Sequence, residues 1–324
     1  MPFDDFAHNP RTLLHIAGAL RNRGVSPLEL FRRVGVPPSA LLDANGWVPR
    51  QLCFALSEEA GIVSGDRFLI SKIGASFELV DFGPWGRTIA GARSVGEACA
   101  VAANNVELLH QGSALRFFTF ARHAELRFEY HGRLGASPHQ HLLGSMVFLR
   151  KIALLAKVPE AVSVRLSIPY SHGAECLEET CGPRLEFGCD YDSIVIDRSI
   201  LDASIGDVGP NPIEVAETAE ATGALLKRLL PYGRANLETV AAHLRVSART
   251  VQRRLRDWGF SFEEILDDVR RTEATRHVIS GENSAIEIAF LLGYSDPAHF
   301  TRAFRRWTGM PPRDYARAFR SNYS

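Results

Sequence analysis

The strongest chemical signal in the sequence is a set of long polar side chains at helical spacing near the C-terminal end. Arg249, Gln252, Arg253 and Arg256 follow one another at i, i+3, i+4 and i+7, so an α-helix would carry all four on one face. Arginine can donate two hydrogen bonds to guanine in the major groove, and glutamine can pair in the same way with adenine. This pattern indicates recognition of duplex nucleic acid rather than covalent chemistry.

A second set of residues follows in the same register about 49 residues later. Ala298, Thr301, Arg302 and Arg305 repeat the spacing, but two of the four are small. We therefore expect the second face to contact fewer bases than the first.

The flanking residues predict a helix-turn-helix around each face, over residues 237–258 and 285–307. In the first, Asn236 and Ser247 are suited to cap its two helices. In the second, Ser284 and Glu287 form a capping box, and Asp296 precedes a proline at the first helical position. Two apolar stripes would face inward in each copy: Leu237, Val240, Ala241 and Leu244 with Val251, Leu255 and Trp258, then Ala285, Ile288, Ala289 and Leu292 with Phe300, Ala303, Phe304 and Trp307. 

The helix predicted between the two copies sets their separation. Residues 262–280 would span about 28 Å as a helix. Two recognition helices entering successive major grooves need a separation of about 34 Å, one turn of DNA. The predicted connection is therefore of suitable length.

Charge is distributed unevenly along a chain that is neutral overall. Residues 234–324 contain 15 arginines and 11 acidic residues, a net charge of +4, which leaves −4 for the preceding residues. With 324 residues and 46% hydrophobic content, the chain is long enough for two domains with real cores. The absence of a long apolar run or a secretory signal pattern, together with five scattered cysteines, predicts a cytoplasmic protein without a membrane partner.

The fold class that we predict is α+β, with a mixed N-terminal domain and an all-α C-terminal domain. Residues 1–206 form the first domain, 207–217 the linker and 218–324 the second. Before the linker, the apolar periodicity predicts helices over 12–23, 27–34, 49–63, 95–111 and 139–157, and strands over 113–120, 124–130, 162–168, 184–187 and 193–196.

Other chemistries are weakly supported. Two groups of residues are close in sequence, His123, His131, His139 and His141, and Cys176, Cys181 and Cys189. They lack the spacing of a metal site, so we predict structural roles and no cofactor. No phosphate loop or nucleophile motif is present, and no cysteine adjoins a histidine as a DNA-repair alkyl acceptor would require, so we do not expect an enzyme.

Aromatic residues are frequent in the first domain: Phe68, Phe77, Phe82, Trp85, Phe117, Phe118, Phe120, Phe128 and Phe148. Such residues form either an ordinary core or the lining of an apolar ligand pocket. The sequence alone assigns no pocket residues.

The C-terminal residues resemble the AraC/XylS-type DNA-binding domain. The resemblance covers residues 218–324 and is most specific over 288–312, where Gly293-Tyr294, Phe300-Thr301-Arg302-Ala303-Phe304 and Gly309 follow the family pattern. It implies a seven-helix unit that grips two adjacent major grooves, with base contacts from residues 249, 252 and 253 and from 298, 301 and 302. Arg245 departs from the family at a turn position where glycine is common, and Ala316 stands where an arginine often follows the tyrosine.

The first ~200 residues more weakly resemble the arabinose-binding-like N-terminal region of one branch of this family, through residues 25–36 and 184–192.

Together these signals predict a DNA-binding transcription regulator, expected to be an activator, with repression kept open. Its expected partners are promoter DNA and a small-molecule effector, with RNA polymerase and a second copy of the chain also kept open. The alternative is an architectural DNA binder whose N-terminal domain only oligomerises. The predicted DNA-binding residues are Ser247, Arg249, Thr250, Gln252, Arg253, Arg254, Arg256, Ala298, His299, Thr301, Arg302, Arg305 and Arg306, with Arg254 and Arg306 expected on phosphates.

Overall fold

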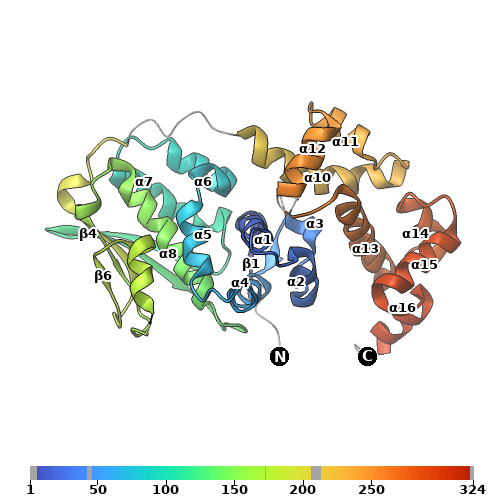
Figure 1. Ribbon diagram of the computed structural model, residues 1–324, viewed down its shortest axis with the longest axis horizontal. Coiled ribbons are helices and arrows are strands. Elements are labelled where there is room, and N and C mark those ends of the chain that lie inside the picture. The colour runs from blue at the N-terminus through green and yellow to red at the C-terminus, as the bar shows by residue number, and fades with distance from the viewer. Residues whose placement is uncertain (1–5, 42–45, 172, 206–212, 258, 322–324) are drawn as a thin grey trace. The chain divides into compact units, whose positions relative to one another are not determined.

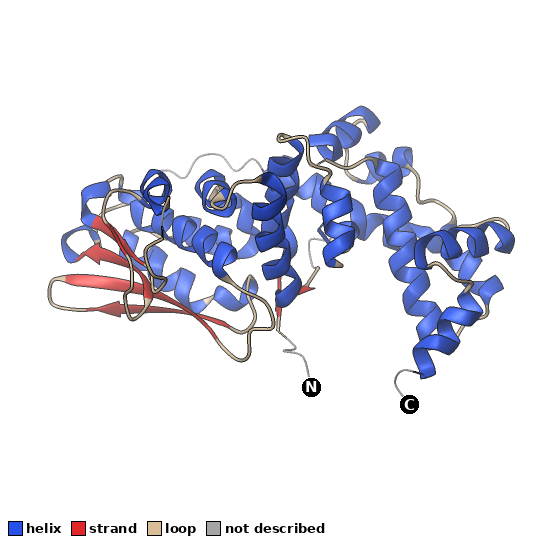
Figure 2. Cartoon of the chain, turned by 60° about the horizontal axis from the view of Figure 1, so that its bottom comes forward, coloured by secondary structure: helices blue, strands red, loops and turns tan. Residues whose placement is uncertain are grey.

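The computed structural model describes residues 6–41, 46–171, 173–205, 213–257 and 259–321. The described chain divides into two compact units, residues 1–36 with 47–213 and residues 37–46 with 214–324. The predicted α+β class is confirmed: the sheets belong to the N-terminal unit, and the described C-terminal residues are helical (Figures 1 and 2).

The N-terminal unit is built on a five-stranded sheet in the order β3-β4-β7-β5-β6. Its strands are β3 (Ser113–Thr119), β4 (His123–Tyr130), β5 (Val162–Arg165), β6 (Leu185–Glu186) and β7 (Asp192–Asp197), all antiparallel except the pair β5 and β6. A short second sheet pairs β1 (Ala7–His8) with β2 (Val48–Pro49). The sequence predicted the five strands of the large sheet in place but not these two.

One face of the large sheet is apolar and buried. Leu126 pairs with Ile194, which in turn pairs with Val164, and all three side chains are fully buried. On the opposite face the carboxylate of Glu125 accepts hydrogen bonds from Arg127 and Arg165. This alternation is the period-two pattern of a sheet covered on one side.

The described residues of the N-terminal unit also form eight α-helices. They are α1 (Leu13–Arg21), α2 (Pro27–Val34), α4 (Arg50–Ser64), α5 (Leu69–Ser76), α6 (Gly83–Ala90), α7 (Val95–Asn104), α8 (His139–Ala153) and the short α9 (Glu178–Cys181). Of these helices, α7 and α8 pack directly against the large sheet. Five of these helices were predicted, although the helix expected over 95–111 ends at Asn104, whereas α5, α6 and α9 were missed. Helices α5 and α8 approach each other closely at Gly74 and Gly144.

The second unit contains the helices α10 (Ile213–Leu229), α11 (Leu237–His243), α12 (Ala248–Asp257), α13 (Phe262–Ser280), α14 (Ala285–Leu291), α15 (Pro297–Thr308) and α16 (Pro312–Ser321). The short α3 (Pro38–Leu41) groups with this unit. Helix α10 begins inside the stretch 207–217 that the sequence suggests as linker, and residues 206–212 lie outside the described ones. Figure 1 shows α13 running from the first helix pair to the second.

Candidate nucleic-acid interface

Helices α11 and α12 form the first helix-turn-helix. The Asn236 side chain accepts a hydrogen bond from Thr239 N and caps α11, and Ser247 Oγ accepts one from Thr250 N at 3.1 Å to cap α12. Val251 and Leu255 are buried on the inner side of α12. Trp258, predicted on the same inner stripe, lies outside the described residues.

The outer face of α12 carries the polar residues that the sequence singled out. Arg249, Gln252, Arg253 and Arg256 are all exposed, and no acidic residue lies among them on this helix before Asp257 at its end. These side chains are thus accessible to a duplex and unopposed by carboxylates on their own face. Arg254 differs, because it is only 8% exposed, and the structure therefore does not present it on the surface as a phosphate contact.

Helices α14 and α15 form the second helix-turn-helix. Ser284 and Glu287 make the predicted capping box, and Gly293 ends the first helix at a φ of +71°. Asp296 caps α15, and its Oδ1 accepts from Ala298 N at 2.8 Å. Phe300 and Phe304, on the inner face of α15, are fully buried.

The outer face of α15 is less polar than that of α12. Ala298, His299, Arg302 and Arg305 are exposed. Thr301 is half-buried, and its hydroxyl donates to Pro297 O at 3.0 Å. Arg306 is exposed but lies 2.6 Å from the Asp267 carboxylate, so this carboxylate partly neutralises its charge.

Helix α13 fixes the second helix-turn-helix through two residues that the sequence did not single out. Arg270 Nε donates to Leu292 O at 3.1 Å, and its guanidinium lies 4.7 Å from the centre of the Tyr294 ring. Asp267 accepts a hydrogen bond from Trp307 Nε1. Both residues act by positioning, and only their contacts across helices reveal that role.

The N-terminal unit contains a second candidate site, a partly open apolar cavity of about 50 Å³. Of the aromatic residues noted in the sequence, Phe77, Phe82, Trp85, Phe128 and Phe148 line it, whereas Phe68, Phe117, Phe118 and Phe120 do not. Its polar lining consists of Thr12, Ser57, His110, His141 and Ser145. An apolar cavity with a few convergent polar groups is typical of a small-molecule site.

The cysteines do not have the character of nucleophiles. Burial raises the pKa of Cys53 and Cys99 to about 12 and that of Cys181 to about 11. Burial also raises the pKa of the two half-buried thiols, Cys176 and Cys189. Because alkyl transfer to protein needs a thiolate, these environments disfavour the repair alternative.

Two helix-turn-helix units with exposed polar faces, joined by one helix, define a DNA-binding transcription regulator. The family model of the N-terminal arabinose-binding domain of AraC transcription regulators matches residues 24–205, and a helix-turn-helix domain model matches residues 240–318. The chain therefore belongs to the AraC family of regulators with this N-terminal domain. In the described residues no helix is long and apolar enough to cross a membrane.

The chain is also similar to individual regulators. It is 28% identical to the ornithine utilization regulator of Pseudomonas aeruginosa over 91% of this chain and 92% of that protein. It is 24% identical to the HTH-type transcriptional regulator VirS of Mycobacterium tuberculosis, over 91% and 92% of the two chains. Among solved structures, the transcriptional regulator CdpR of P. aeruginosa is similar with a TM-score of 0.42 and 20% identity, covering 98% of this chain and 99% of that one.

Proposed function

We propose that this regulator recognises specific promoter sequences chiefly through α12. The observation that carries the proposal is the exposed face of Arg249, Gln252 and Arg253 above the buried Val251 and Leu255. A helix anchored on one side and lined with arginine and glutamine on the other matches the donor and acceptor pattern of major-groove edges.

In this proposal α15 enters the neighbouring major groove and reads fewer bases. Arg302 is its main base-reading residue, while Ala298 contributes only apolar contact and His299 and Arg305 lie near phosphates. Since Arg306 already faces a carboxylate, we expect its phosphate contact to be weaker than that of Arg305.

We further propose that a small-molecule effector in the N-terminal cavity controls DNA binding. The aromatic lining favours a compact, largely apolar molecule, and the few polar groups would orient it. A ligand can change DNA binding only by preferring one arrangement of the two units over another. RNA polymerase and a second copy of the chain are further partners in this proposal.

The DNA-binding proposal is tested with the full chain and its genomic target, found by footprinting. Affinity should fall steeply with salt, because arginine–phosphate contacts release counterions. Arg253→Ala should cost about 1–3 kcal/mol and relax preference at one base pair. Arg228→Ala, which removes an exposed arginine of α10, serves as the charge-matched control. An equal loss for Arg253→Ala on every DNA sequence would contradict the base-reading role.

The effector proposal is distinguished from an architectural role by ligand titration. Candidate effectors should raise the thermal stability of the N-terminal unit and change affinity for the promoter. The variant Val106→Phe places a larger side chain at the cavity lining and should abolish both effects. DNA binding that no effector alters, with a stable N-terminal oligomer, would favour the architectural alternative.

A further inference from the structure

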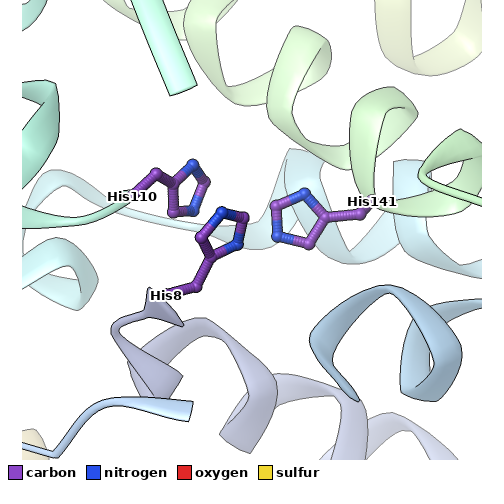
Figure 3. A group of neighbouring side chains, drawn as sticks. All are labelled: His8, His110 and His141. Carbon is purple, nitrogen blue, oxygen red and sulfur yellow. The ribbon is translucent and has the colours of Figure 1, made fainter. Parts of the chain in front are cut away.

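Three histidines that are far apart in the sequence meet inside the N-terminal unit. His8 on β1 forms an antiparallel bridge with His110, flanked by hydrogen bonds from Asn9 N to Leu109 O and from Gln111 N to Ala7 O. His141 lies in the first turn of α8. Figure 3 shows the three imidazole rings gathered together from these separate segments.

The rings are in direct contact and almost inaccessible to solvent. Ring centres lie 4.0 Å apart for His8 and His110, 5.1 Å for His8 and His141, and 5.0 Å for His110 and His141. The exposed fractions of the three residues are 1%, 6% and 8%. One ring nitrogen from each residue can be chosen so that all three lie within 4.8 Å of one another.

Several of these buried nitrogens have no hydrogen-bond partner in the described part of the chain. They are both ring nitrogens of His8 and Nδ1 of His110. A buried polar group without a partner destabilises the folded state, because it has lost its hydrogen bonds to water. A cluster of such groups facing one another therefore suggests a ligand that would satisfy them together.

His141 already has the contact that a metal-binding histidine usually makes on its second nitrogen. Its Nδ1 lies 2.9 Å from Tyr130 Oη and 3.5 Å from Ser145 Oγ. With the proton on Nδ1 donated to Tyr130 Oη, Nε2 keeps its lone pair, and this is the arrangement found around zinc ligands.

The electrostatics favour neutral imidazoles. Burial lowers the pKa of His141 to about 4, and burial together with the neighbouring histidines lowers the pKa of His8 and His110. Neutral rings offer lone pairs at pH 7. The buried guanidinium of Arg50 also acts on His8, although its amino groups donate to the carbonyls of Gly112 and His131.

We propose that His8, His110 and His141 bind a divalent late transition metal such as Zn²⁺. Tetrahedral ligands about 2.0–2.1 Å from zinc lie about 3.3–3.4 Å from each other. The His8 and His110 rings are stacked, with 18° between their planes, so one of them must rotate out of the stack before both lone pairs can point at the same ion. Because Arg50 adds positive charge nearby, we expect the fourth ligand to be an anion. His110 and His141 also line the apolar cavity, which provides the space for that ligand.

The first test measures metal content and affinity in the full-length protein. Chelator-stripped protein should bind one Zn²⁺, measured by calorimetry and by elemental analysis after dialysis. His8→Phe and His110→Phe keep an aromatic ring but remove a ligand, and each should lower affinity at least about tenfold. His131→Gln, which alters an exposed histidine of the same unit, should bind like the unchanged protein. Stoichiometry well below one, or equal affinity in all variants, would overturn the proposal.

A second test does not depend on the ligand variants folding. Co²⁺ added to the unchanged protein should give the visible bands of a tetrahedral site without a thiolate charge-transfer band. Tyr130→Phe should weaken binding by about 10–100-fold with the same spectrum, because it removes only the outer contact to His141. A thiolate band would assign the metal to cysteines such as Cys176 and Cys189 and refute the histidine site. The outcome is independent of DNA binding, which is measured separately.

Discussion

Asp267 of α13 accepts a hydrogen bond from Trp307 Nε1 of α15 at 2.9 Å, while its other carboxylate oxygen lies 2.6 Å from Arg306. One carboxylate thus contacts two successive residues of the helix expected to enter the second groove. Since α13 also leads from the first helix-turn-helix, this contact sets the orientation of α15 within the unit.

Removing this carboxylate should loosen α15. Asp267→Ala leaves the indole N–H without its acceptor, which we expect to cost about 1–3 kcal/mol of local stability. Hydrogen exchange of the α15 amides should become faster, and affinity for a two-groove DNA site should fall. Glu282→Ala, in the loop before α14, is the charge-matched control. Unchanged α15 exchange in Asp267→Ala would show that the contact does not position the helix.

The turn of the first helix-turn-helix carries a strained residue. Arg245 has a φ of +53°, a left-handed conformation that disfavours side chains other than glycine. Arg245→Gly should raise the free energy of unfolding by about 1 kcal/mol, after allowing for the greater freedom of glycine in the unfolded chain. The urea midpoint measures this change. Arg253→Gly, in the middle of α12, should instead lower stability by roughly 1 kcal/mol, and destabilisation by both variants would contradict the strain argument.

Stability of the C-terminal unit should depend on pH through Glu273. Burial raises the pKa of this carboxyl, but hydrogen bonds and charges from Lys227 and Arg276 outweigh that effect and hold the pKa below its ordinary 4.5. Because the pKa of Glu273 is lower in the folded state, its ionised carboxylate stabilises the folded protein above pH 4.5. This stabilisation is lost as the pH falls through the folded-state pKa. Glu273→Gln should therefore be less stable by about 1 kcal/mol at pH 7.

The same comparison at acid pH checks the cause. The difference between Glu273→Gln and the unchanged protein should shrink towards zero below the folded-state pKa, as measured by denaturant unfolding across pH. A difference that persists at low pH would assign the effect to packing.

A side chain at Gly74 would collide with α8, whereas Gly61 in α4 has room for a methyl group. A Cβ at Gly74 would lie 2.5 Å from Gly144 O, so Gly74→Ala should destabilise the N-terminal unit by about 1–3 kcal/mol. A Cβ at Gly61 would meet its nearest atom at 3.4 Å, so Gly61→Ala in α4 should be neutral or stabilising by about 0.5 kcal/mol. Thermal unfolding of the two variants measures both effects, and equal melting temperatures would refute the close-approach argument.

The elements of the C-terminal unit could be predicted because their signals are local. Caps at Asn236, Ser247 and Ser284 and apolar stripes repeating at i, i+3 and i+4 define each helix within a few residues of sequence. The polar faces of α12 and α15 follow from the same periodicity, since a buried stripe leaves the opposite side exposed. Helices α5 and α6 were missed because glycines at 74, 83 and 86 weaken the helical pattern, and packing against their neighbours stabilises them instead.

Only the tertiary structure determined which distant residues meet. The burial of Arg254, the contacts of Asp267 and Arg270, and the cavity lined by five of the nine aromatic residues have no spacing that marks them in the chain. The same holds for His8, His110 and His141, which strand pairing and the start of α8 bring together. Local sequence specifies helices because their hydrogen bonds join near neighbours, whereas a site formed across the core depends on how those elements pack.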